Sequence, residues 1–406
     1  MKPSLLPVAE AKARLLAHAR PIEKIEILPL AQTGGRVLAS DVLANLTQPP
    51  FDASAMDGYA LRSSDAAVIG SEVTVIGSAA AGHAFDGKVG AGEAVRIFTG
   101  APVPDGADTI LIQEDAEKLD GNRIRTTFAV VPGRHIRPRG QDFAEGEAVL
   151  AAGTLLDFTK ITVAAAMNQA ELAVYRKPVV ALLATGDELV LPGGKPGMAQ
   201  IIASNTFGVS TLVRDNGAEV LDLGIVPDDP EKIASAVSAA RLAGADVLVT
   251  IGGASVGDHD LVQGVLKSAG MELDFWRIAM RPGKPLMVGR LGDMQVLGLP
   301  GNPVASLVCS LLFLEPYLRR LARLPERSRE TEAATVTALP ANDLRQDYVR
   351  ARLSLDDYGN RLVETFGKQD SSMMKILSRS DCLVVRPPDA PELLVGNTCP
   401  IILLHP

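Results

Sequence analysis

The chain has 406 residues, of which 47% are hydrophobic and 22% are charged, and its formal net charge at pH 7 is −8. One hydrophobic core stops growing at roughly 250 to 300 residues, so this length predicts two to four domains. The apolar fraction excludes a disordered chain, and the negative charge argues against a protein that binds nucleic acid.

The amino-terminal and cysteine patterns indicate a protein of a reducing compartment. Charged residues between Glu10 and Arg14 interrupt the first apolar stretch, so no signal peptide is expected. The apolar run at 304–314 is far shorter than the roughly 20 residues of a membrane span. The three cysteines lack a CxxC spacing and cannot all pair; they are Cys309, Cys382 and Cys399. We therefore expect a cytoplasmic protein with no membrane segment.

Short strand-like runs divided by turn residues dominate the front half. Runs such as 95–98 and 109–113 are separated by Gly, Pro and Asp clusters, which predicts an inserted β-rich domain at 46–145. Helix-like stretches at 22–43 and 158–171 lie on either side of it. We expect these flanks, within 1–45 and 146–177, to form a small linking domain.

Two segments of the β-rich domain are candidates for function. The segment 52–60 contains Asp57-Gly58, which is typical of a hairpin turn, but a turn does not explain the small residues around it. The basic loop 134–139 leads into Asp142 and is either a solvated surface or an oxyanion contact in this acidic protein.

Alternating strand and helix signals from 178 to 326 predict a parallel α/β domain. Strands are expected at 179–184, 219–226 and 247–251, and helices at 204–216, from Asp229-Pro230-Glu231 to 244, and at 260–268. From 327 to 406 alternation continues without long helices, which predicts a carboxyl-terminal β-barrel or sandwich. The fold class is therefore multidomain α/β plus β.

Three strand-to-loop junctions of the α/β domain end in carboxylates, which include Glu188, Asp228 and Asp258. Ligands of parallel sheets bind beyond the carboxyl ends of the strands, so neighbouring strands would bring these acids together. Carboxylate oxygens suit Mg²⁺. The alternative is that each acid caps a helix, which is the preferred interpretation for Asp229.

Loops rich in glycine and proline follow the other strands. Gly252-Gly253 allows close backbone approach to a ligand, although the signatures of a P-loop and of a dinucleotide fold are missing. The segment 281–285 places Arg281 and Lys284 on a proline-stiffened loop, and 299–303 opens a helix whose first amides can face an anion. Either loop alone is compatible with ordinary turn chemistry.

Read in chain order, six motifs together resemble the molybdopterin molybdenumtransferase family. They are DGYA at 57–60, FTGAPVP at 98–104, TGDEL at 185–189, GGASVGD at 252–258, RPGKP at 281–285 and LPGNP at 299–303. The resemblance implies a linking domain, a β-rich insertion, a molybdopterin-binding α/β domain and a carboxyl-terminal β domain. It also implies a homodimer and Mg²⁺ dependence. The pattern departs at 367–372, where Asp370 stands in place of an expected glycine, and at 380–382.

The resemblance and the loops together give a set of candidate site residues. The catalytic candidates are Asp57, Thr99, Asp142, Glu188, Asp258 and Lys284. The metal candidates are Glu188, Asp228 and Asp258. The candidates for binding substrate are Gly252, Gly253, Ser255, Arg281, Pro300, Pro303, Arg350 and Ser371. We also expect Arg350 and Ser371 to face the α/β domain of the neighbouring subunit.

The implied reaction inserts molybdate into adenylyl-molybdopterin and releases AMP, and tungstate would need the same donors. The implied partners are a molybdopterin adenylyltransferase and downstream cofactor-delivery proteins, with neither nucleic acid nor membrane. One alternative is a non-catalytic scaffold like gephyrin, whose additional domains and long linker are missing here. The other is the adenylyltransferase step itself, against which the extra β domains argue.

Overall fold

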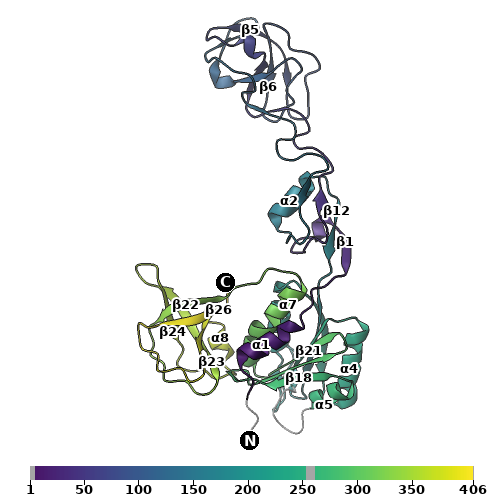
Figure 1. Ribbon diagram of the computed structural model, residues 1–406, viewed down its shortest axis with the longest axis vertical. Helices are drawn as coiled ribbons and strands as arrows, with labels where there is room; N and C mark the ends of the chain where they lie inside the picture. The colour runs from purple at the N-terminus through teal and green to yellow at the C-terminus, as the bar shows by residue number, and fades with distance from the viewer. Residues whose placement is uncertain (1–4, 253–260, 406) are drawn as a thin grey trace. The chain divides into compact units, whose positions relative to one another are not determined.

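The structure is a computed structural model that describes residues 5–252 and 261–405. The chain divides into two compact units (Figure 1), one formed by Glu26–Val174 and the other by Met1–Ile25 together with Tyr175–Pro406. Each unit has its own sheets and hydrophobic clusters. In the described part of the chain, no helix has the length and apolarity needed to cross a membrane.

The unit Glu26–Val174 is built around a six-stranded sheet. Neighbouring strands within this sheet are antiparallel, except for β5 and β6, which are parallel. Alternate residues of β4 enter two hydrophobic clusters, Tyr59 and Leu61 in one and Ala60 in the other, as the period of a strand requires. In spatial order the strands are β7 (Thr109–Ile112), β4 (Gly58–Leu61), β6 (Glu93–Ile97), β5 (Glu72–Ala79), β9 (Arg123–Thr126) and β8 (Ala116–Lys118).

The flanks of this sheet form three small two-stranded sheets and one helix. Asp157 caps α2 (Phe158–Ala166), because its carboxylate accepts hydrogen bonds from the Thr159 and Lys160 amides. The helix expected at 158–171 is thus confirmed for 158–166, since β12 begins at Glu171, but the one expected at 22–43 is wrong. Pro29 would break such a helix, and a strand followed by a 3₁₀ turn occupies this stretch. The pairs are β1 (Ile25–Pro29) with β12 (Glu171–Tyr175), β2 (Val42–Leu43) with β11 (Ala148–Leu150), and β3 (Ala53–Ser54) with β10 (Ile136–Arg137).

A second six-stranded sheet forms the α/β domain. Its first four strands are parallel, which confirms the expected architecture for them, whereas β20 runs antiparallel to both of its neighbours, β21 and β18. The sheet is therefore mixed. Only two residues, Gly292 and Asp293, join β20 to β21, and so short a connection permits only an antiparallel pair. In spatial order the strands are β16 (Glu219–Val226), β13 (Val179–Thr185), β17 (Val247–Ile251), β21 (Met294–Leu299), β20 (Pro285–Leu291) and β18 (Glu272–Arg277).

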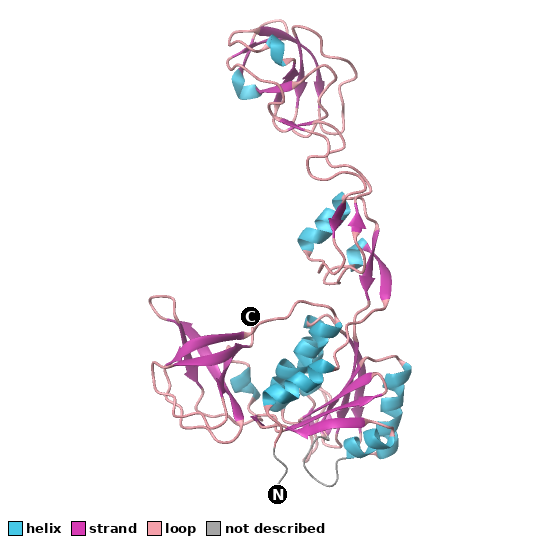
Figure 2. Cartoon of the chain, viewed as in Figure 1, coloured by secondary structure: helices cyan, strands magenta, loops and turns pink. Residues whose placement is uncertain are grey.

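Helices cover both faces of this sheet (Figure 2). One face packs on α4 (Pro230–Leu242) and α5 (Leu261–Ser268), and the opposite face packs on the remaining helices of the domain. Asp229 caps α4 as expected, while Ser204 precedes α3 without a side-chain capping bond. The helices of the opposite face are α1 (Val8–Ala17), α3 (Asn205–Asp215), α6 (Pro303–Cys309), the π-helical turn η4 (Ser310–Leu314) and α7 (Glu315–Leu321).

The carboxyl-terminal strands close into a five-stranded barrel. The strand β23 pairs with both β24 and β25, and β22 and β26 complete the ring. Of the two expected architectures, a barrel or a sandwich, the structure therefore has the barrel. The short strand β19 (Met280–Arg281) pairs with β23 and joins the barrel to the α/β domain. The helix α8 (Met374–Leu377) precedes β25. The barrel strands are β22 (Glu330–Thr335), β23 (Gln346–Leu355), β24 (Arg361–Thr365), β25 (Cys382–Arg386) and β26 (Thr398–Leu403).

Candidate active site at the carboxyl edge of the α/β sheet

A pocket of about 760 Å³ lies at the carboxyl ends of β13, β17 and β21. We refer to it as the sheet-edge pocket. The strand ends contribute Thr185, Ile251 and Pro300, and the beginnings of α3 and α6 contribute Asn205 and Pro303. Its other lining residues are Ala184, Glu188, Leu189, Ile201, Ile202, Ala203, Ser204, Thr206, Gly252, Pro285, Gly301, Asn302, Ser372 and Met374.

Close backbone approach shapes this pocket at Gly252. Its φ is +92°, and a Cβ atom there would lie 2.7 Å from the carbonyl oxygen of Thr185. Only glycine fits, as the sequence suggested. The Thr185 hydroxyl is buried and has no hydrogen-bond partner within 5–252 and 261–405. A buried hydroxyl without a partner is costly, so this oxygen is available to a ligand that enters the pocket.

Acidic side chains gather beside the pocket because β13 and β16 are neighbours. Thr185 pairs with Val226, so the residues that follow the two strands meet, and the Asp228 amide donates a 3.3 Å hydrogen bond to the Asp187 carboxylate. Burial, together with the charges of Asp187 and Glu188, raises the pKa of Asp228. These acids do not cap helices. Among the described acids of these strand-to-loop junctions, the capping interpretation holds for Asp229.

The strand order corrects one expectation about this cluster. Asp228 and Asp258 were expected to follow adjacent strands, but β13 lies between β16 and β17. The strand between them is the one that leads into Glu188. Asp258, Gly253 and Ser255 lie outside the described residues. Among the residues that are described, no three His, Cys, Asp or Glu side chains gather at a spacing that would hold a metal.

The two cations at the end of β19 and in the loop that follows it, Arg281 and Lys284, differ in their surroundings. The Arg281 Nε donates a 2.7 Å hydrogen bond to Asp347, and Asp343 also lies within ion-pair distance. The hydrogen bond to Asp347 raises the pKa of Arg281. Lys284 is exposed, directly precedes the pocket residue Pro285, and makes no ion pair with the described part of the chain.

Barrel residues reach the start of α6 within the same chain. The Asn302 side-chain amide donates a 2.9 Å hydrogen bond to the Ser371 hydroxyl, and the Val304 amide donates to the Ser371 carbonyl. One of the helix amides that were expected to face an anion is therefore already bonded. The sequence offered no signal for this contact, because 69 residues separate its partners.

Arg350 lies inside the barrel unit rather than at a surface. It is 1% exposed, and burial lowers its pKa. Its Nε donates to the Gln369 side chain at 3.2 Å and its Nη1 to the Met373 carbonyl at 3.2 Å. In this arrangement Arg350 holds the segment that carries Ser371.

The candidates in the unit Glu26–Val174 form a separate group. The Asp57 carboxylate accepts 2.8 Å hydrogen bonds from the amide and the hydroxyl of Thr99, and these lower its pKa. Asp57-Gly58 is not a hairpin turn: β3 and β4 do not pair, and a Cβ atom on Gly58 would lie 2.1 Å from the Leu111 carbonyl. Asp142 is exposed.

Sequence reasoning missed Arg96 in this unit. Its guanidinium lies 5.0 Å from the ring centre of Tyr59 and 4.9 Å from that of Phe98, next to the segments that carry Asp57 and Thr99. The only available signal was an arginine within an apolar strand.

Family models match three parts of the chain. The MoeA N-terminal region (domain I and II) matches residues 6–168, the probable molybdopterin binding domain matches 181–320, and the MoeA C-terminal region (domain IV) matches 332–404. The molybdopterin biosynthesis MoeA protein from Pyrococcus horikoshii has a similar structure. It is 28% identical, covers 99% of this chain and 100% of its own, and has a TM-score of 0.81. The fold and the sheet-edge pocket therefore define a multidomain α/β protein of the MoeA type.

Curated relatives extend this similarity to the sequence as a whole. A molybdopterin molybdenumtransferase from Haemophilus influenzae is 32% identical over 399 residues, which is 98% of each chain. Molybdopterin molybdenumtransferase 2 from Mycobacterium tuberculosis is 35% identical over 95% of each chain. The chain belongs to the molybdopterin molybdenumtransferase family.

Proposed function

We propose that this chain catalyses the last step of molybdenum cofactor assembly, in which molybdate is inserted into adenylyl-molybdopterin and AMP is released. The observation that carries the proposal is the sheet-edge pocket, where Gly252 brings two strand ends together and Glu188 lines the cavity. The pocket lies within the part of the chain that matches the molybdopterin binding domain.

The acids beside the pocket fit a divalent cation. Carboxylate oxygens are hard ligands, and the charges of Asp187 and Glu188 are among the causes of the raised pKa of Asp228, so a cation would relieve this repulsion. We assign Mg²⁺ to Glu188 and Asp228, with Asp258 as a third candidate from the sequence. Bound there, Mg²⁺ would neutralise the charge of the diphosphate and of the departing AMP.

Other residues of the chain would bind and orient the substrates. The Thr185 hydroxyl makes no hydrogen bond with the described residues, so it would be available to donate one to a substrate oxygen. Lys284 supplies positive charge beside a pocket whose only charged lining residue, in the described part of the chain, is Glu188. Arg350 would act by positioning the Ser371 segment. Asp57, Thr99 and Asp142 remain catalytic candidates from the resemblance.

The family resemblance also supports a homodimer that receives its substrate from an adenylyltransferase and works in the cytoplasm. A non-catalytic scaffold would release no AMP, and an adenylyltransferase would consume ATP. Incubating the purified protein with adenylyl-molybdopterin, molybdate and Mg²⁺ distinguishes these functions, because AMP and active cofactor should form without ATP.

The decisive variant is Glu188→Gln, which removes one charge and preserves the shape of the side chain. We expect AMP release to fall about a hundredfold, as is typical when one preorganised electrostatic contact of an active site is lost. Glu272→Gln is the matched control, because Glu272 is an exposed glutamate at the start of β18 and lies outside the pocket. Equal AMP release from both variants would remove Glu188 from the mechanism.

A further inference from the structure

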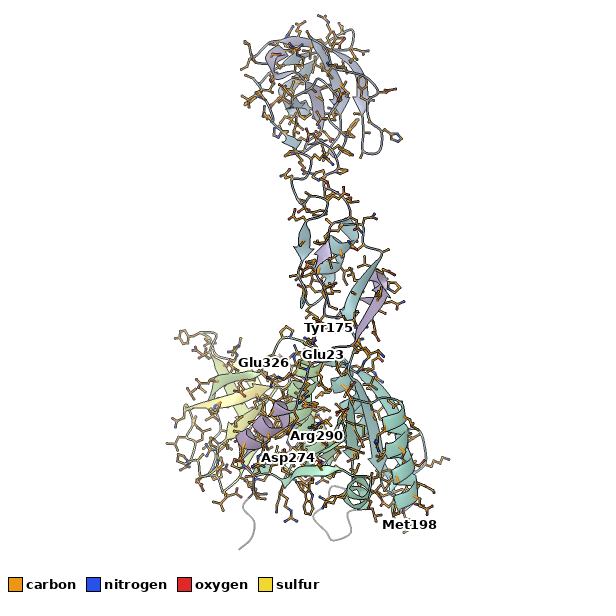
Figure 3. All side chains as sticks on the ribbon, turned by 45° about the vertical axis from the view of Figure 1, so that its right-hand side comes forward. Glu23, Tyr175, Met198, Asp274, Arg290 and Glu326 are labelled. Carbon is orange, nitrogen blue, oxygen red and sulfur yellow. The ribbon has the colours of Figure 1, made fainter. Side chains whose placement is uncertain are left out.

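A second pocket, of about 620 Å³, lies in the same unit and shares no lining residue with the sheet-edge pocket. Residues of α1, η4, α7 and the segment from α7 to the start of β22 line it, together with Ile402 of β26. We call it the basic pocket. Figure 3 labels Glu326, one of its lining residues.

The lining combines an apolar surface with a strong excess of positive charge. Leu16, Leu311, Leu312 and Ile402 form the apolar part. Six basic side chains line the pocket against three acidic ones, Glu315, Glu326 and Glu330, although the whole chain is acidic. The basic residues are Lys12, Arg319, Arg320, Arg323, Arg327 and Arg329.

Most of this positive charge is not compensated by carboxylates. Arg329 is paired with Glu315 through bonds of 2.7 and 2.9 Å, and both side chains are nearly buried. Arg319 and Arg320 donate instead to the carbonyls of Pro325 and Leu16, which carry no net charge. Arg323 likewise donates to the Ile22 carbonyl.

Arg327 is the least constrained of these cations. It is exposed, and it makes neither a hydrogen bond nor an ion pair with residues 5–252 or 261–405. Burial and the neighbouring charge of Arg327 both lower the pKa of Arg319, so the guanidinium groups are crowded without enough acid nearby. An anion in this pocket would relieve that crowding.

We propose that the basic pocket binds a small organic anion, with its carboxylate, sulfonate or phosphate group on the guanidinium groups and its apolar body on the leucine and isoleucine side chains. Arginine recognises such planar or tetrahedral anions through several hydrogen bonds at once. A cavity of 620 Å³ is in the range of roughly 300 to 1,000 Å³ that small-molecule sites occupy, and it is larger than an inorganic ion requires.

The probe for this test is 8-anilinonaphthalene-1-sulfonate, an aromatic sulfonate that fluoresces in apolar surroundings. N-phenyl-1-naphthylamine has the same aromatic body without the charge. In the purified full-length chain, Arg320→Gln/Arg327→Gln should weaken sulfonate binding by about tenfold, because two exposed charges that attract the sulfonate are removed. Binding of the neutral amine should stay within twofold of the unaltered chain.

Glu326→Gln is the opposing control from the same pocket. Removing this acid should strengthen sulfonate binding by about twofold, since it deletes a repulsive charge. The sulfonate Kd should also rise between low and high KCl while the amine Kd does not. Thermal midpoints of all variants show that they remain folded.

Three results would overturn the proposal. Unchanged sulfonate binding by the double variant would show that the sulfonate binds outside the basic pocket. Equal loss of both probes would make the pocket an apolar groove without anion recognition. A sulfonate Kd that rises with protein concentration as the chain self-associates would show that a second copy covers this surface.

Discussion

The two pockets of the larger unit differ in the sign of their charge. Within the described residues, the sheet-edge pocket has one charged lining residue, Glu188, with Asp187 and Asp228 close to it. The basic pocket has six cations in place. An anionic substrate would therefore meet repulsion in the first and attraction in the second.

This difference bears on the function that we propose for the sheet-edge pocket. Carboxylates and apolar groups alone would not hold a diphosphate and an oxyanion, so the proposal requires a metal ion and cations from adjacent segments to complete the site. The backbone shape of the pocket and its charge can then be tested separately.

The largest effect is expected from Gly252→Ala. An alanine at φ +92°, with its Cβ 2.7 Å from the Thr185 carbonyl, should lower the free energy of unfolding by about 2 to 4 kcal/mol. Chemical denaturation measures this loss. The part of the variant that stays folded should also release AMP more slowly, because the two strand ends are forced apart.

Gly264→Ala is the control for this substitution. Gly264 lies within α5 and has no atom within 4 Å of the added methyl group. Alanine should therefore stabilise the helix by about 0.5 to 1 kcal/mol. If Gly252→Ala were as stable as Gly264→Ala, the tight backbone contact at the pocket would not exist.

The elements that form by local chemistry were predictable from the sequence. The Asp229-Pro230-Glu231 signal fixes the start of α4, and the β-branched runs fix β13, β16 and β17. The stretch 22–43 misled the prediction because its apolar spacing fits a helix, while Pro29 and the pairing of β1 with the distant β12 favour a strand. Such pairing depends on tertiary structure and leaves no local signal.

The candidate site was predictable where it follows from strand ends. Convergence of the loops after β13 and β16 required only that these strands be neighbours. The strand order was not predictable, and it separates β16 from β17. The pairing of Arg281 with Asp347 and the burial of Arg350 depend on how the barrel packs, so residue type alone could not distinguish them from the exposed Lys284.

A smaller effect should separate the two cations beside the sheet-edge pocket. Lys284→Gln should raise the molybdate concentration for half-maximal insertion about tenfold, because it deletes a charge that no described acid compensates. Arg281→Gln should raise it by less than about threefold, since its charge is already paired with Asp347.

The measurement for this pair is cofactor formation as a function of molybdate, with Mg²⁺ held constant. Unfolding curves correct for any loss of stability when Asp347 loses its partner. A larger effect at Arg281 than at Lys284 would mean that the Arg281–Asp347 pair opens when substrate binds. A separate titration with Mg²⁺ at constant molybdate completes the test. If Lys284→Gln changed only the Mg²⁺ requirement, our assignment of Lys284 to molybdate would be wrong.

The smallest effect is expected from mixing two inactive variants of the proposed homodimer. Ser371 bonds to Asn302 of its own chain, at the pocket that Glu188 lines. This intramolecular contact argues against our expectation that Ser371 serves the neighbouring subunit.

If both residues act within one chain, every heterodimer of Glu188→Gln and Ser371→Ala has one defect in each site. Mixing should then restore no activity above the mean of the two variants. If the site were shared, random exchange of subunits would leave about a quarter of all sites intact. Native mass spectrometry of differently tagged chains must first show that exchange is complete, and recovery near a quarter would then establish that Ser371 acts across the interface.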